Sequence, residues 1–234
     1  MFKQLLTDLC DYSADLFRNI KTARVSIDCY DDLGDGEFDT AVAVDVELSG
    51  HKPSHAATIT RPFDYGTVIA YSFNQSHWQA SRFSDGTTFG VWYGSEEMET
   101  TIHETIHHWK RFVHDAYGGI DQEIVADRRV VLARCQGLLI NLIGKEKEFP
   151  ALVNRNDYSF TQRVGNYLVQ NSQSGLLVKS ARSEGINAAI FNPDILSNPR
   201  DFCYLTYFWN PASSDQIRVE RERGTTLMLA TESA

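Results

Sequence analysis

The segment TTIHETIHHW at residues 100–109 contains three side chains that could hold a metal ion and activate its bound water: His103, Glu104 and His107. On a helix, histidines four residues apart share one face, so both rings could reach a tetrahedral zinc ion while the glutamate serves as the base. Such a site needs a third protein ligand, for which Glu123 is the candidate. One hypothesis is therefore a zinc-dependent peptidase. The other interpretation places the histidines at packing and surface positions of a helix.

The same glutamate also ends a second series of spaced residues. Tyr93 lies 11 residues before Glu104, at the end of the strand-like segment TTFGVWYGS. Arg82, followed by an aromatic residue, lies 22 residues before it, and Arg61 in TITRPF lies 43 residues before it. The order is arginine, arginine with an aromatic neighbour, tyrosine at a strand end, and glutamate on a helix.

Two further motifs follow downstream. Residues 159–165, SFTQRVG, have the pattern Ser-x-x-Gln-x-x-Gly, and residues 175–180, GLLVKS, form a short apolar stretch that ends in serine. Over about residues 57–215 the complete set resembles the RES domain, a family named for its Arg, Glu and Ser residues. Both Ser159 and Ser180 match a serine of that family, and the resemblance implies that such a serine hydrogen-bonds ribose or nicotinamide.

The resemblance implies chemistry on NAD+. RES proteins resemble ADP-ribosyltransferases in fold and act as toxins of toxin–antitoxin pairs. They break the nicotinamide–ribose bond and pass ADP-ribose to water, phosphate or a protein, with no metal expected. The implied partner is a helix-turn-helix antitoxin of the Xre type, and the implied organism is bacterial.

The resemblance also implies a role for each upstream residue. Glu104 would stabilise the oxocarbenium-like ribose that remains when nicotinamide departs. Arg61 and Arg82 would grip the pyrophosphate, because a planar guanidinium pairs two oxygens at once. The ring of Tyr93 would hold nicotinamide or adenine, and its hydroxyl would fix the orientation.

The sequence departs from the family pattern at two positions. Ser84 stands where an asparagine is usual, and His103 stands where a small or aliphatic residue usually precedes the glutamate. A third hypothesis therefore stays beside the NAD+-consuming enzyme and the zinc peptidase: an inactive module that binds a nucleotide without turning it over.

Composition excludes several other classes of function. The chain has 234 residues, 42% hydrophobic and 23% charged, which is the balance of an ordinary folded domain. Its net charge of −9 and its lack of Lys/Arg-rich runs disfavour a direct nucleic-acid or membrane partner. The four scattered cysteines, with no Cys-x-x-Cys pair and no apolar leader, predict a reduced protein of the cytoplasm.

Hydrophobic periodicity predicts the elements that must position these residues. An amphipathic helix is expected over about residues 2–17, a strand in 40–50 and extended pieces in 57–73. A helix is expected over 95–117, two strands from residue 129, and then a short helix followed by three strands. The predicted class is α+β. The resemblance further implies an ADP-ribosyltransferase-like fold with a curved sheet and a nucleotide cleft over 58–234, behind an N-terminal extension, residues 1–57, of helix and strand.

Overall fold

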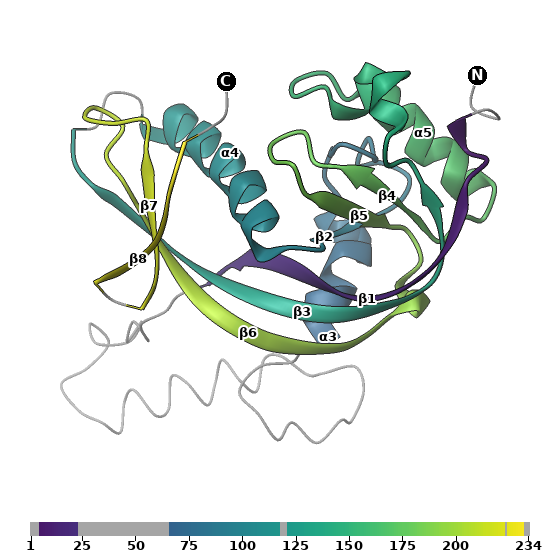
Figure 1. Ribbon diagram of the computed structural model, residues 1–234, viewed down its shortest axis with the longest axis horizontal. Helices are drawn as coiled ribbons and strands as arrows, with labels where there is room; N and C mark the ends of the chain where they lie inside the picture. Colours follow the sequence, from purple (N-terminus) through teal and green to yellow (C-terminus); the bar gives the residue numbers. More distant parts are fainter. Residues whose placement is uncertain (1–4, 23–65, 118–120, 223, 232–234) are drawn as a thin grey trace. The chain divides into compact units, whose positions relative to one another are not determined.

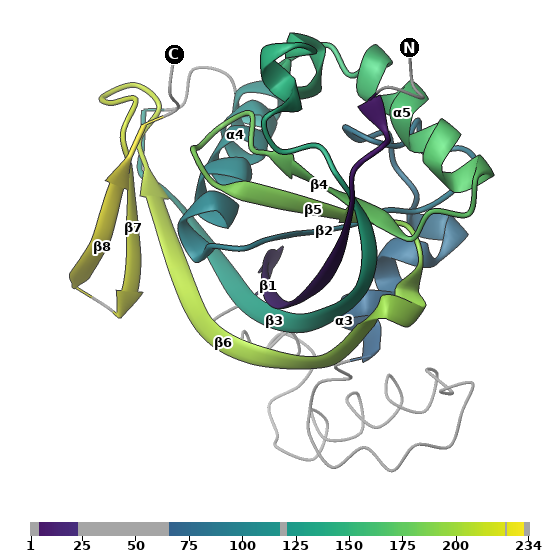
Figure 2. The same ribbon diagram turned by 45° about the vertical axis from the view of Figure 1, so that its right-hand side comes forward.

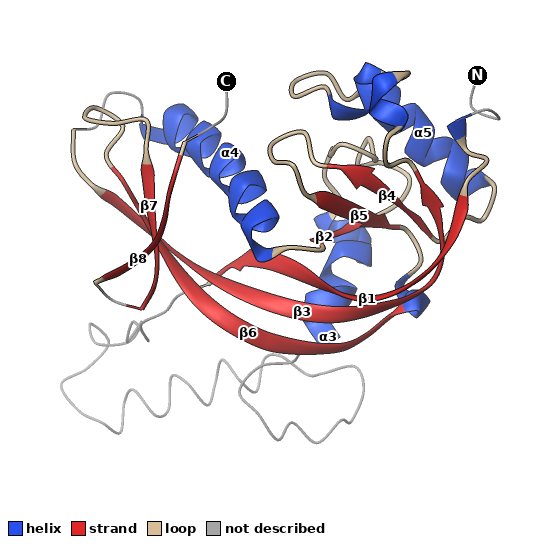
Figure 3. Cartoon of the chain, viewed as in Figure 1, coloured by secondary structure: helices blue, strands red, loops and turns tan. Residues whose placement is uncertain are grey.

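The framework of the protein is one mixed sheet of eight strands. In a computed structural model of the chain, the structure describes residues 5–22, 66–117, 121–222 and 224–231, all of which belong to one unit. Figure 3 shows strands forming most of this unit, with few helices. The predicted mixed class of helices and strands is confirmed.

The strands are β1 (Leu9–Lys21), β2 (Trp92–Ser95), β3 (Ile124–Asn141), β4 (Gly175–Lys179), β5 (Ile186–Ile190), β6 (Leu196–Trp209), β7 (Ile217–Glu222) and β8 (Thr225–Ala230). The described α-helices are α3 (Gly66–Ala70), α4 (Met98–Tyr117) and α5 (Ser159–Gln170). Short 3-10 turns occur at Tyr71–Phe73, Gln75–His77, Lys145–Lys147, Pro150–Val153 and Pro193–Ile195.

The strand order partly closes the sheet on itself. The order is β1-β2-β5-β4-β3-β6-β7-β8, and β1 also pairs with β3. Strands β1, β2, β5, β4 and β3 therefore form a closed circuit, while β6, β7 and β8 continue from β3 as an open wing. Figures 1 and 2 show β3 and β6 as long, curved strands with α4 on their inner side.

Helix α4 is held in place by an apolar stripe. Ile102, Ile106, Trp109 and Val113 recur at spacings of three and four, are all buried, and pack in one cluster with residues of β3, β6 and β7 such as Tyr207. This spacing is the face of an amphipathic helix. The opposite face of α4 is thereby left free to present polar side chains. Within the described residues, no helix is long and apolar enough to cross a membrane.

The predicted helix over residues 2–17 is wrong. Residues 9–21 form β1, which runs antiparallel to β3 from Leu9 opposite Ile140 to Lys21 opposite Arg128. The leucines and phenylalanines of this segment fit a helical period, but the tertiary partner decides between helix and strand. The backbone N–H and C=O groups of the thirteen-residue strand that face β3 form hydrogen bonds with it. This partner lies far away in the sequence, so the local pattern cannot reveal it.

Of the other predicted helices and strands, most are confirmed and two segments are wrong. The strand ending at residue 94, helix 95–117, the short helix and the later strands are confirmed as β2, α4, α5, β4, β5 and β6. The segment from 129 is one long strand instead of two, and residues 66–73, expected as extended, are helical. This helical segment packs beneath β2, where Trp92 Nε1 donates to the Val68 carbonyl at 3.1 Å.

The expected strand in 40–50 and Arg61 lie outside the described residues. The division between an N-terminal extension, 1–57, and a domain over 58–234 stays a prediction. Strand β1, from within the proposed extension, is nevertheless paired with strands of the proposed domain.

We predict that Leu16→Ala lowers the free energy of unfolding by about 2–5 kcal/mol, because this side chain is 0% exposed. Leu9→Ala, at a side chain that is 57% exposed, should change it by less than about 0.5 kcal/mol. Residues seven apart share a face of a helix but lie on opposite faces of a strand. Urea denaturation measures both variants, and equal losses would contradict the strand.

Candidate active site

A pocket of about 520 Å³ opens between α4, β1, β2, β5 and the loop at residues 80–83. Glu104, Tyr93 and Arg82 all line it. Three of the residues singled out by their spacing in the sequence are thus brought together in space. The sheet circuit achieves this by placing β2 between β1 and β5, while α4 follows shortly after β2 in the chain.

Glu104 lies in the second turn of α4 and is held by two side-chain donors. Ser180 Oγ and Asn187 Nδ2 both donate to Glu104 Oε1, each at 2.7 Å. Arg182 Nε lies 3.9 Å from the other carboxylate oxygen, Oε2. The Glu104 side chain remains 25% exposed, so it is both anchored and accessible to a ligand.

The direction of both hydrogen bonds is set by neighbouring groups. The backbone N–H groups of Arg182 and Ser183 donate to Ser180 Oγ at 3.0 and 3.2 Å, which leaves its hydroxyl proton for Glu104. Ser95 Oγ donates to Asn187 Oδ1 at 2.6 Å, which turns the amide N–H₂ of Asn187 toward the carboxylate. The anchor of Glu104 therefore combines α4, β2, β5 and the turn that follows β4.

The hydroxyl of Tyr93 is used inside the protein. It accepts from the backbone N–H of Phe83 at 2.9 Å and shares a hydrogen bond of 2.9 Å with Ser81 Oγ. Burial raises the pKa of Tyr93 to about 12, so the hydroxyl stays protonated. The ring of Tyr93 lines the pocket while its hydroxyl fixes the loop that carries Arg82.

The guanidinium of Arg82 makes structural hydrogen bonds. Its Nη1 donates to the carbonyls of Asn154 at 2.7 Å and Leu152 at 3.3 Å, and its guanidinium lies 4.7 Å from the centre of the Tyr158 ring. Burial lowers the pKa of the Arg82 guanidinium below its ordinary value. The side chain thus braces a loop and lines the pocket at once.

The Ser-x-x-Gln-x-x-Gly segment forms α5 and supports the same loop from behind. Gln162 Nε2 donates to the carbonyls of Ser81 at 3.0 Å and Ser84 at 3.3 Å. A Cβ atom at Gly165 would lie 1.9 Å from the Phe83 carbonyl oxygen, so only glycine permits this approach. The glutamine and glycine of the motif position the pocket wall.

The two candidate serines lie in different surroundings. Ser159, the first residue of α5, is exposed, its backbone N–H is bonded to Asp157, and it is not among the pocket residues. Ser180 is 3% exposed and contacts Glu104 directly. The structure brings Ser180 to the site and does not bring Ser159 there.

Comparison with known proteins identifies the family of the chain. A family model described as the RES domain matches residues 51–210, well over half of the chain. The chain belongs to the RES domain family. A solved structure similar to it is the M. tuberculosis MbcT-MbcA toxin-antitoxin complex, at 10% identity and a TM-score of 0.44, covering 87% of this chain and 88% of the matched chain. No curated protein matches the sequence.

Two arginines of this RES domain that line the pocket were not predicted from the sequence. Arg18 on β1 and Arg128 on β3 both line the pocket, and neither has a hydrogen-bond or salt-bridge partner among the described residues. Burial lowers the pKa of Arg18 to about 10, which leaves it charged at neutral pH, and its guanidinium lies 5.3 Å from the centre of the Trp92 ring. Arg18 was missed because the preceding segment was expected to form a helix, whereas residues 9–21 form a strand. An arginine within the β-branched run of β3 was the available signal for Arg128.

The zinc hypothesis receives no support from the geometry of this RES domain. Among the described residues, no group of three or more His, Cys, Asp or Glu side chains is placed to hold a metal ion. Glu123, the proposed third ligand, lies 3.4 Å from Arg218 Nη2, and Glu104 is bonded to Ser180 and Asn187. His107 instead packs edge-to-face against the neighbouring imidazole of His108.

We predict that Gly165→Ala destabilises the protein, by about 1–3 kcal/mol in a urea titration, because the new methyl group collides with the Phe83 carbonyl. Helix propensity alone predicts the opposite sign, since alanine stabilises a helix by about 1 kcal/mol relative to glycine. A more stable variant would show that α5 does not press on the 81–84 loop.

Proposed function

We propose that this RES domain cleaves the nicotinamide–ribose bond of NAD+. The observation that carries the proposal is the charge of the pocket. Among the described residues that line it, Glu104 is the single carboxylate, and five side chains are basic: Arg18, Lys21, Arg82, Arg111 and Arg128. The chain as a whole has a net charge of −9. A substrate with two phosphates and a developing positive charge suits this distribution.

In the proposed reaction, the bond between ribose C1 and the nicotinamide nitrogen breaks. The bonding pair moves to the ring nitrogen and neutralises its positive charge, and the ribose carbon becomes oxocarbenium-like. Glu104 stabilises that cation, because its carboxylate is already oriented by Ser180 and Asn187 and need not reorganise during the reaction. An acceptor oxygen then bonds to C1 and loses its proton. Water, phosphate or a protein hydroxyl each satisfies this step.

The other pocket residues then divide into binding and support. Arg18, whose Nη1 is buried without a hydrogen-bond partner among the described residues, is the stronger candidate to bind a phosphate, because Arg82 already donates to two backbone carbonyls. The Tyr93 ring offers a flat wall for nicotinamide or adenine. Arg61, placed in this site by the family resemblance, lies outside the described residues.

The cellular role follows from the same activity. Uncontrolled cleavage of NAD+ would deplete a cofactor that the cell needs, so an active enzyme requires restraint. We propose that the protein is a toxin of the bacterial cytoplasm that is neutralised by an antitoxin, as the resemblance to RES toxins implies, with the antitoxin of the Xre helix-turn-helix type.

The first test is Glu104→Gln, which keeps the size of the side chain and removes its charge. We expect nicotinamide release from NAD+, followed by liquid chromatography, to fall by about 100-fold or more. His107→Ala, on the same helix, should stay within about twofold of the unchanged protein. If the purified, antitoxin-free protein leaves NAD+ intact, the proposal fails. Binding of NAD+ without turnover would identify the inactive module instead.

A second test separates the two serines. Ser180→Ala removes a hydrogen bond to Glu104 Oε1 and the acceptor of two backbone N–H groups, so kcat should fall by about tenfold or more. Ser159→Ala changes an exposed side chain and should leave kcat within about twofold. Thermal unfolding checks that both variants fold. A larger loss of kcat in Ser159→Ala than in Ser180→Ala would identify Ser159 as the serine that acts in the site.

A further inference from the structure

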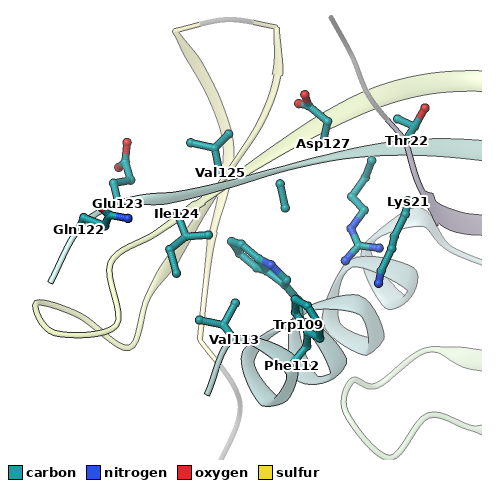
Figure 4. Close-up of a pocket in the computed structure, with 12 residues that line it drawn as sticks. Lys21, Thr22, Trp109, Phe112, Val113, Gln122, Glu123, Ile124, Val125 and Asp127 are labelled. Atoms are coloured by element: carbon teal, nitrogen blue, oxygen red, sulfur yellow. The ribbon is translucent and has the colours of Figure 1, made fainter. Parts of the chain in front are cut away.

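A second pocket adjoins the first. It has a volume of about 550 Å³, lies between α4 and the first half of β3 (Figure 4), and shares Lys21, Trp109, Phe112 and Arg128 with the pocket of Glu104. Glu104 itself does not line it. Along α4, Phe112 lies about 12 Å beyond Glu104 at 1.5 Å per residue. The second pocket therefore extends the site away from the carboxylate.

Arg128 stands at the junction of the two pockets without a polar partner. It is 7% exposed, and its Nε is buried with no hydrogen-bond acceptor among the described residues. Its sequence neighbours differ: Asp127 accepts from Thr206 Oγ1 at 2.8 Å, and Arg129 is paired with Asp201. A buried guanidinium without an anion is costly, and a ligand that supplies the anion removes that cost.

The nearby carboxylates do not supply that anion. Asp127 points to the opposite side of β3 from Trp109 and Lys21 (Figure 4), as strand alternation requires. Glu123 lies at the far end of the pocket and is 3.4 Å from Arg218 Nη2. The positive charge of Arg128 thus faces the pocket without a matching negative charge among the described residues.

Three neighbours of Arg128 suit the other parts of a nucleotide. Asn19 Oδ1 is buried without a donor among the described residues, while its Nδ2 donates to Tyr207 Oη at 2.8 Å, so the free oxygen can accept from a hydroxyl. The exposed Lys21 adds positive charge, with its Nζ 5.1 Å from the centre of the Phe112 ring. Phe112 is 51% exposed and offers a ring face for stacking.

We infer that Arg128 and Lys21 bind a phosphate group on the adenosine side of the substrate, with Asn19 at a ribose hydroxyl and Phe112 at the base. The inference rests on the proposed function and adds the direction of the dinucleotide: nicotinamide lies at Glu104, and adenosine lies along α4 toward Phe112. A nucleotide phosphate is favoured over free phosphate because Asn19 and the exposed Phe112 ring line the same pocket as Arg128.

Calorimetric titration with ADP tests the site without requiring catalysis. Arg128→Gln should weaken ADP binding by about tenfold or more. The neighbouring Arg129→Gln, which removes an equally buried arginine that has its own carboxylate partner, should leave the affinity within about twofold. The exposed Lys21→Gln, which should not disturb folding, should weaken binding by about threefold or more. Equal ADP affinities for the unchanged protein, Arg128→Gln and Lys21→Gln would overturn the inference.

Inorganic phosphate is titrated in parallel to identify the source of the anion. If Arg128→Gln loses affinity for free phosphate and keeps its affinity for ADP, the site belongs to a phosphate co-substrate and the inference is wrong. Loss of ADP affinity supports a nucleotide.

Kinetics then separates this inference from the proposed function. In Arg128→Gln, kcat/KM for NAD+ should fall by about tenfold or more, while cleavage of nicotinamide riboside, which has neither phosphate nor adenosine, should stay within about twofold. Cleavage of NAD+ that is insensitive to Arg128→Gln overturns the inference and leaves the proposed function standing. If the unchanged protein cleaves neither compound, the proposed function is wrong. The ADP titration then still shows whether Arg128 binds a nucleotide phosphate.

Discussion

The pairing of β1 with β3 is the constraint on which the site depends. This ladder runs the full length of β1, from Leu9 opposite Ile140 to Lys21 opposite Arg128, and it closes the circuit of strands through β2, β5 and β4. It also places Arg18, Asn19 and Lys21 beside α4. Each of these residues lies on a strand that is held by backbone hydrogen bonds, so the strand pairing fixes the backbone positions from which the side chains enter the pocket.

The carboxylate of Glu104 shows how the rest of the fold uses that frame. Its two donors come from β5 and from the turn after β4, and each donor is oriented by a further group, Ser95 for Asn187 and backbone N–H groups for Ser180. A carboxylate held in this way does not need to reorient when a positive charge develops beside it. The glycines at the contacts between elements serve the same purpose. Gly185 lets the turn approach Thr100 on α4, and Gly165 lets α5 approach Phe83.

Charge distribution distinguishes the pocket from the rest of the chain. The chain as a whole is acidic, yet basic side chains outnumber acidic ones in the pocket. Most charged groups of the neighbouring strands are paired, as Arg129 is with Asp201. Arg18 and Arg128 have no such partner among the described residues, and both line the pocket. Unpaired buried charge is tolerated in folded proteins mainly where function requires it.

The sequence by itself determined the helix that carries Glu104, the strands with alternating or continuous apolar runs, and the spacing of Arg82, Tyr93 and Glu104. These features are local, because helical and strand periods and short motif distances are written within a few residues. Only the tertiary structure decided that residues 9–21 are a strand, that Ser180 and not Ser159 reaches Glu104, and that Arg18 and Arg128 line one pocket. Each of these depends on a partner more than 70 residues away in the chain, and a local pattern contains no information on which distant segment will satisfy its backbone or its charge.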